Sequence, residues 1–229
     1  MKKNIFAVCV FYLIAVLLRY LTNRTGLLDG INNSVVVTLL QGVGPTVGAV
    51  VAMILFRIKP VMSLQGVFSN LFIPFSIYWL FPVVLIGAFA FFTNGTLPII
   101  AIFTVLAYGL LEEIGWRGFL QQQLSHLPKF IGILIIAVLW FVWHLNFDLT
   151  TANLMFFLIL LLGSWGIGLV ARKTNSLLAA AAFHSLNNFF GTLDLPKAII
   201  VVILVTIWVL SIVYRNRIIK QKNNVASLG

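Results

Sequence analysis

The only two glutamates in the chain are adjacent, at Glu112 and Glu113, and they follow an apolar run that ends at Leu111. Arg117 lies four residues after Glu113, a spacing at which opposite charges pair on a helix. Glu112 points about 100° away around the same helix and has no expected partner of its own within it. A helix end with a local ion pair would need one carboxylate only, so we interpret Glu112 as a candidate for chemistry.

Two histidines lie in other apolar segments. His144 ends the aromatic sequence WFVWH, and His184 lies in a later run that also contains Asn188. Asn188 is one helical turn after His184 on the same face of the helix. The imidazole and the amide can therefore point toward the same position. The alternative for these groups is hydrogen bonding between helices or at the membrane interface. The third histidine, His126, is expected to be solvated.

Together these side chains have the chemistry needed to activate water. A desolvated carboxylate at Glu112 can act as a general base, and a nearby imidazole can orient the attacking water. The second imidazole and the amide of Asn188 can donate hydrogen bonds to the oxyanion of a tetrahedral intermediate. This set is sufficient for peptide hydrolysis without a covalent nucleophile.

The composition excludes a soluble enzyme, a disordered protein and a secreted disulfide scaffold. Of the 229 residues, 61% are hydrophobic and 9% are charged, against roughly 45–50% and about 25% in soluble domains. The single cysteine, Cys9, allows no intrachain disulfide. The net charge of +10 is carried at the ends of apolar stretches, so we expect no nucleic-acid partner.

Eight apolar stretches are candidates for transmembrane helices, which need about 20 mostly apolar residues each. They lie at about 5–21, 34–56, 71–93, 98–119, 130–147, 154–171, 176–193 and 197–214. Continuous rather than alternating apolar runs favour helices over a transmembrane β-barrel. We therefore expect one all-α polytopic membrane domain over residues 1–229, a bundle of about eight transmembrane helices, with a motif-bearing core at about 98–193.

The distribution of lysine and arginine predicts the orientation of this bundle. Eleven of the fifteen fall on one side of the eight-span map, two fall on the other, and Arg19 and Arg117 lie within spans. Such a bias marks the cytoplasmic side. Both termini are therefore expected to be cytoplasmic, in a bacterial plasma membrane. The first stretch lacks a small-x-small cleavage site and is interpreted as a retained anchor.

Two segments have alternative interpretations. Residues 57–70 are expected to form an amphipathic linker at the membrane interface or a plain cytoplasmic loop. The second span contains the spacing Gly44-x-x-x-Gly48, which favours close packing of helices. The alternative for that span is an unwound segment of the kind that transporters use.

At the polar residues the chain resembles the CPBP family of intramembrane proteases, the CAAX-processing and bacteriocin-maturation enzymes also called the Abi family. That family's pattern begins with two adjacent glutamates and an arginine four residues after the second. This first motif matches fully at Glu112, Glu113 and Arg117. The resemblance covers roughly residues 98–193.

Two further motifs, F-x-x-x-H and H-x-x-x-N/D, follow in the same order as in the family. The last matches fully at His184 and Asn188. The other departs from the pattern, because the aromatic residue four positions before His144 is Trp140 rather than phenylalanine. The departure keeps an aromatic plate beside the imidazole.

The resemblance implies an intramembrane CAAX-type endopeptidase that cleaves a membrane-anchored, possibly lipidated, peptide or protein within membrane lipid. It implies that Glu112 is the general base, that His144 helps to orient the water, and that His184 and Asn188 stabilise the oxyanion. Glu113 and Arg117 would then form a structural pair or assist at the substrate. The sequence leaves the oligomeric state open.

A catalytic zinc is an open alternative, since the family has also been described as metalloproteases. Glu112, His144 and His184 have the chemistry of three zinc ligands that leave one position for water. However, the chain has no H-E-x-x-H motif, and a glutamate that binds the metal cannot also be the base.

Two other functions compete with hydrolysis. A proton-coupled transporter also uses buried carboxylates and histidines, and a non-enzymatic protein that confers immunity to a bacteriocin could retain the same scaffold. One feature also strains the protease interpretation: the predicted spans place Glu112 about 21 Å below the outer surface at 1.5 Å per residue, and His144 much nearer to that surface.

Overall fold

A computed structural model describes residues 2–189 and, beyond them, residues 195, 198–200, 202, 203, 206, 207 and 210. Within this part of the chain every named element is helical, and Ser63 and Ser176 form an isolated β-bridge. The all-α fold expected from the sequence is confirmed for these residues.

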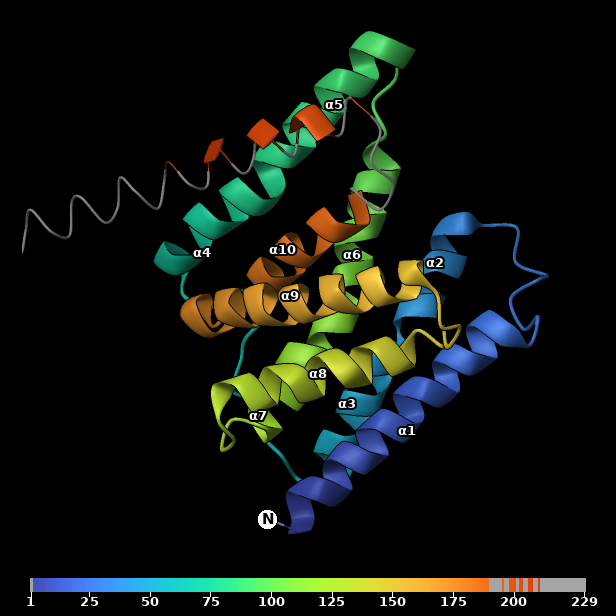
Figure 1. Ribbon diagram of the computed structural model, residues 1–229, viewed down its shortest axis with the longest axis vertical. Coiled ribbons are helices and arrows are strands. Elements are labelled where there is room, and N and C mark those ends of the chain that lie inside the picture. The colour runs from blue at the N-terminus through green and yellow to red at the C-terminus, as the bar shows by residue number, and fades with distance from the viewer. Residues whose placement is uncertain are drawn as a thin grey trace, which may run out of the picture.

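The helices follow the predicted apolar stretches (Figure 1). Five of them are α1 (Lys2–Arg24), α6 (Ile99–Gly115), α8 (Lys129–Trp143), α9 (Thr151–Thr174) and α10 (Leu177–Phe189). The second stretch is divided into α2 (Ser34–Gly42) and α3 (Gly44–Phe56). The third consists of α4 (Phe68–Phe75), the π-helical turn η1 (Ser76–Leu80) and α5 (Phe81–Asn94). Helix α6 continues through a second π-helical turn, η2 (Trp116–Leu120), into α7 (Gln121–Gln123).

Four of the described helices are long and apolar enough to cross a membrane: Asn4–Arg24, Leu71–Thr93, Ile99–Gln123 and Thr151–Thr174. Helices α2 and α3 meet at 43° and add a fifth if they form one bent span, whereas α8 and α10 are apolar but shorter. The expected eight spans are therefore not confirmed. The last predicted span, 197–214, lies largely outside the described residues, and the cytoplasmic termini stay a prediction.

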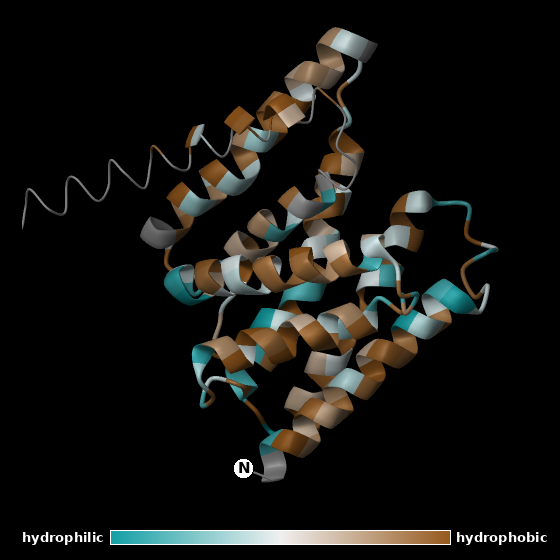
Figure 2. Cartoon of the chain, viewed as in Figure 1, coloured by the Kyte–Doolittle hydropathy of each residue, from teal (hydrophilic) through white to brown (hydrophobic). Residues whose placement is uncertain are grey.

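The exposed faces of the long helices are apolar. On α1, for example, Phe6, Leu13 and Leu17 are each more than half exposed. Hydrophobic residues run along the length of α1, while hydrophilic residues gather at its C-terminal end and in the loop that follows (Figure 2). Soluble proteins rarely expose such large continuous apolar surfaces, so this surface suits contact with lipid in a multi-pass membrane protein.

The glycines of the second span permit close packing of α3 against α1. A Cβ atom on Gly44 would lie 2.7 Å from the carbonyl oxygen of Ala15, and one on Gly48 would clash with the carbonyl oxygen of Phe11. Only glycine lets the two backbones approach this closely. The expected packing role of the Gly44-x-x-x-Gly48 spacing is confirmed.

The break between α2 and α3 is also a structural feature with local partners. The side chain of Asn33 caps the start of α2 by accepting hydrogen bonds from the N–H groups of Val35 and Val36. At the end of α2, Arg19 of α1 donates from Nη1 to the carbonyl oxygen of Gln41 at 2.9 Å. A cation at a helix C-terminus satisfies exposed carbonyl groups and opposes the helix dipole.

The connection after α3 is a loop that caps another helix. Residues 58–67 contain no helix. The carbonyl oxygens of Ser63 and Leu64 accept hydrogen bonds from the backbone N–H groups of Leu177 (3.1 Å) and Leu178 (3.0 Å) at the start of α10. Of the two interpretations of this segment, the structure favours a loop, and the loop satisfies donors that the first turn of a helix leaves free.

Candidate active site

A helical hairpin brings the glutamate pair and the aromatic motif to the same level. Glu112 lies 11 residues before the end of α7 at Gln123, and Trp140 lies 11 residues after the start of α8 at Lys129. At 1.5 Å per residue, both lie roughly 16 Å from the turn. The predicted end of the span at residue 119 was too early, because the helix continues through η2. This extension removes part of the mismatch in depth: His144, 15 residues after Lys129, still lies roughly 6 Å further from the turn than Glu112 does.

Trp140 is the centre of the polar cluster. Its indole Nε1 donates to Oε2 of Glu112 at 2.7 Å, although the two residues are 28 positions apart. The edge of the His184 ring meets the Trp140 ring at a centroid distance of 5.1 Å. The guanidinium of Arg117 lies over the same ring, 5.1 Å from its centroid. We call Glu112, Glu113, Arg117, Trp140 and His184 the Trp140 cluster; all five are buried.

The carboxylate of Glu112 is held in a fixed orientation inside the bundle. The indole N–H of Trp116, one turn later on the same helix, also donates to Oε2, at 3.3 Å. The Tyr108 hydroxyl, one turn earlier, interacts with Glu112 as well. Because Glu112 is only 1% exposed, these donors replace the water that would otherwise solvate the carboxylate.

Glu113 contacts Arg117 of its own motif and His184 of the H-x-x-x-N motif through its two oxygens. Oε1 lies 2.7 Å from Nδ1 of His184, and Oε2 lies 3.3 Å from Nε of Arg117. The i,i+4 pair predicted between Glu113 and Arg117 is confirmed. A carboxylate only accepts hydrogen bonds, so Nδ1 of His184 carries the proton in this contact. Glu113 thereby fixes the ring of His184.

Two nitrogen donors of the buried Arg117 side chain lack hydrogen-bond partners among the described residues. The side chain is fully buried, and the two donors are Nη1 and Nη2. The ion pair with Glu113 and the Trp140 ring compensate part of its charge. An arginine buried in this way is strongly dependent on its carboxylate.

His144 stands at the edge of the cluster. As the C-cap residue of α8 it places Nδ1 2.8 Å from the carbonyl oxygen of Trp140, one turn earlier. Its ring centroid lies 6.2 Å from that of Trp140 and 4.8 Å from that of Phe156, and the residue is half-buried. Since Nδ1 faces an acceptor, Nδ1 carries the proton and Nε2 of the neutral ring is an acceptor.

Asn188 is the one predicted site residue that the described contacts do not join to the cluster. It follows His184 by one turn of α10 but is exposed, whereas His184 is only 3% exposed. Among the residues that the structure describes, no hydrogen bond joins Asn188 to either glutamate. Its role in oxyanion stabilisation stays a prediction.

Small residues allow the neighbouring helices to hold the end of α6. A Cβ atom on Gly109 would lie 3.2 Å from the carbonyl oxygen of Ala181 in α10, one turn before His184. One on Gly115 would clash with Pro45 of α3, and Thr46 donates its hydroxyl to the carbonyl oxygen of Leu111. The glutamates therefore lie on a helix that is fixed from two sides.

Two residues that contact Glu112, Trp116 and Tyr108, are absent from the prediction made from the sequence, and Trp140 has a role beyond the predicted one. Trp116 and Tyr108 lie four residues after and before Glu112, so i,i+4 spacing on α6 could have identified both as partners. Trp140 was expected only as an aromatic plate, whereas its N–H is also a hydrogen-bond donor to Glu112. Phenylalanine at that position has no such donor.

The described residues do not form a ready metal site. No three His, Cys, Asp or Glu side chains among them are close enough together to hold a metal ion. The polar atoms that the structure describes on Glu112, His144 and His184 also face other partners: two indoles, a backbone carbonyl and a carboxylate. Zinc ligation by these three residues stays a prediction, and no step below is routed through a metal.

The fold and the cluster define a class: an all-helical membrane protein with two glutamates, an arginine and a histidine buried around a tryptophan. Residues 93–190 match the family described as type II CAAX prenyl endopeptidase Rce1-like, and all three motifs lie within this range. The match covers less than half of the chain and supports a similarity to the CPBP family of CAAX proteases. A search of curated proteins gave no match.

Proposed function

We propose that the protein hydrolyses a peptide bond of a membrane-anchored substrate, with or without a lipid group, using a water molecule activated by Glu112. The observation that carries this proposal is the carboxylate of Glu112, which is buried, oriented by the Trp140 N–H and surrounded by the histidine-bearing helices. A buried ionisable group in a membrane protein is costly, which favours a functional reason for it. The proposed location is the plasma membrane of a bacterium.

In the first step Glu112 removes a proton from water while the water oxygen attacks the carbonyl carbon of the scissile bond. His144 accepts a hydrogen bond from this water through Nε2, since its Nδ1–H is used by the carbonyl group of Trp140. The hydrogen bonds from Trp140 and Trp116 hold the carboxylate of Glu112 in one orientation. The entropy cost of orienting this base is therefore met when the protein folds and does not add to the reaction barrier.

The oxyanion of the tetrahedral intermediate is stabilised by donors from α10. For His184 to donate through Nε2 while Nδ1–H faces Glu113, both ring nitrogens must carry protons. The resulting imidazolium faces the Glu113 carboxylate, which compensates its charge. Asn188, one turn later, is proposed as the second donor.

The intermediate collapses when the carbon–nitrogen bond breaks. The proton that Glu112 took from water passes to the leaving amine, which restores the carboxylate and leaves a new C-terminal carboxyl group on the other product. Base and acid are then the same residue, and no covalent enzyme intermediate is formed.

The test is the cleavage of a membrane-anchored reporter peptide by purified protein in lipid. We expect Glu112→Gln and His184→Ala each to lower kcat by about 1,000-fold or more, as loss of a base or oxyanion donor does. Asp148→Asn, a matched change in the exposed loop after α8, should leave kcat unchanged. Wild-type turnover by a folded Glu112→Gln protein would refute the proposal.

The competing functions have weaker support. The carrier interpretation rests on buried carboxylates and histidines and on an unwound segment in the second span. That span is interrupted between α2 and α3, which meet at 43°, but Gly44 and Gly48 beside the break permit the packing of α3 against α1. Proton flux driven by a solute in liposomes, without peptide cleavage, would favour a carrier. Full protection against a bacteriocin by the Glu112→Gln protein would favour the immunity function.

A further inference from the structure

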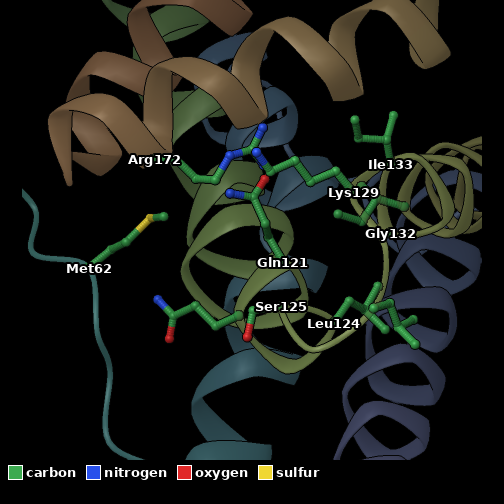
Figure 3. A pocket seen from close by; sticks show the side chains of 11 residues that line it. Met62, Gln121, Leu124, Ser125, Lys129, Gly132, Ile133 and Arg172 are labelled. Carbon is green, nitrogen blue, oxygen red and sulfur yellow. The ribbon is translucent and has the colours of Figure 1, made fainter.

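A cavity of about 210 Å³ lies away from the Trp140 cluster, where the ends of several helices meet. It is bounded by α7, the first half of α8, the last turns of α9 and Met62 of the loop after α3 (Figure 3). All these segments lie on the side of the bundle that the lysine and arginine distribution predicts to be cytoplasmic. In this predicted orientation the cavity lies near the level of the cytoplasmic lipid headgroups.

The charge of the cavity is entirely positive. Lys129 at the start of α8 and Arg172 near the end of α9 both line it, and none of the described lining side chains is acidic. In Figure 3 the two long side chains extend from opposite sides toward the same region beside Gln121. Two cations that approach one another without a carboxylate repel, so an anion between them would stabilise this arrangement.

A neutral donor also lines the cavity. The backbone N–H of Val61 donates to Oε1 of Gln122 at 3.2 Å, which fixes the direction of this side-chain amide. Its other end, Nε2, is buried and has no hydrogen-bond partner among the described residues. A buried N–H donor without an acceptor is unfavourable, and an anionic oxygen would satisfy it.

Most of the remaining lining of the cavity is apolar, apart from Gln121 and Ser125. Leu124, Ile133 and Ile136 line it, and on α8 the neighbouring side chains of Phe130 and Leu134 are exposed to the surroundings. A ligand that fits these walls is negatively charged at one end and apolar at the other. A soluble phosphate would satisfy the cations only.

We propose that this cavity binds the headgroup of an anionic phospholipid, with the phosphate between Lys129 and Arg172 and a further headgroup oxygen as the acceptor for Nε2 of Gln122, which also lines the cavity. The acyl chains would then lie along the exposed apolar face of α8. Basic sites between helices at the cytoplasmic surface are suited to such headgroups because anionic lipids are concentrated there. The proposal does not depend on the peptidase activity, and it would hold for a carrier or an immunity protein as well.

The experiment uses the full chain in detergent micelles with added lipid, and it measures the thermal midpoint and the lipids retained in native mass spectrometry. A ligand that binds only the folded state raises the midpoint as its concentration increases. We expect phosphatidylglycerol to raise Tm and to be retained at least tenfold over phosphatidylcholine. The double variant Lys129→Gln/Arg172→Gln should lose this preference, whereas Lys173→Gln, an adjacent exposed cation that does not line the cavity, should keep it.

Three outcomes would overturn the proposal. The first is a double variant that retains phosphatidylglycerol as well as the wild type does, and the second is an equal loss of preference in Lys173→Gln. The third is stabilisation by millimolar inorganic phosphate that equals that by the lipid, which would assign the cavity to a soluble anion. Gln122→Leu provides an independent check: it removes a donor without changing charge and should weaken lipid retention without abolishing it.

Discussion

Two tryptophans of α8, three residues apart, lie in closely similar surroundings but serve different regions of the molecule. Trp140 and Trp143 are both buried, and each donates its indole N–H to a residue of another helix. Each also has an arginine over its ring, Arg117 at 5.1 Å and Arg19 at 4.4 Å. An apolar environment favours this arrangement, because the ring compensates part of the charge of a guanidinium that is fully buried in Arg117 and partly buried in Arg19.

The acceptors distinguish the two regions. Trp143 donates to the backbone carbonyl of Ala15 in α1 at 3.0 Å, while Trp140 donates to the carboxylate of Glu112. Likewise Arg19 donates to a backbone carbonyl at the end of α2, while Arg117 pairs with Glu113. Backbone carbonyl groups do not exchange protons. The contacts around Trp143, which involve Ala15 and Arg19 and which we call the Trp143 region, therefore serve to join helices. The Trp140 region has carboxylates that can exchange protons, so it is the region suited to catalysis.

Removal of Glu113 should have the largest effect. Glu113→Ala leaves Arg117 buried without its carboxylate, which should lower the free energy of unfolding by about 3–5 kcal/mol. Glu113→Gln keeps an acceptor and should cost about 1–3 kcal/mol, but it no longer compensates a doubly protonated His184, so kcat should fall about 100-fold. Chemical denaturation and reporter cleavage measure the two effects. A Glu113→Gln protein with wild-type kcat would show that this carboxylate has only a structural role.

The paired variants Trp140→Phe and Trp143→Phe test the comparison directly. Trp140→Phe restores the aromatic residue of the family pattern but removes the donor to Glu112, so kcat should fall about tenfold as the base loses its orientation. Trp143→Phe removes a bond to a backbone carbonyl and should cost about 1–2 kcal/mol of stability, with kcat unchanged. Equal losses of kcat in both variants would contradict the distinction between the regions.

Arg19 should matter less than either tryptophan. Arg19→Lys keeps the charge but loses the planar contact with the Trp143 ring and the geometry of the bond to Gln41. We expect a loss of about 1 kcal/mol in the free energy of unfolding and a kcat within twofold of the wild type. A larger loss of activity than of stability would place Arg19 in the catalytic region, which it approaches through Tyr108.

The sequence predicted the positions of most helices and the members of the cluster for physical reasons. Apolar stretches are visible because lipid requires them, and Glu112, Glu113 and His184 are visible because charge is rare within them. The donors were not visible in the same way. Trp116 and Trp140 are ordinary apolar residues for a membrane helix, and only the three-dimensional contact turns the second into a partner of Glu112.

Depth was the other feature that the sequence did not determine. Hydropathy falls after residue 119, so the sequence predicts a span over 98–119. In the structure, however, α6 continues through η2 into α7 and ends at Gln123, and Arg117 and Gln121 are buried. Hydropathy averages over all faces of a helix, so it underestimates a helix that has polar residues on its inner face only. The exposure of Asn188 could not be predicted either, because helical spacing defines a face but not what covers it.

Metal removal should have the smallest effect. The polar atoms described on Glu112, His144 and His184 face protein donors and acceptors, so we expect activity to be unchanged by EDTA or 1,10-phenanthroline. The purified protein should contain less than one zinc per ten chains, as measured by inductively coupled plasma mass spectrometry; the threshold is an order-of-magnitude criterion, about tenfold below a filled single site. Inhibition by the chelator with recovery on addition of zinc would mean that these three side chains rearrange around a metal. Glu112 would then be a ligand and not the base. Trp140 would differ from Trp143 because it contacts a metal ligand, and not because it contacts a general base.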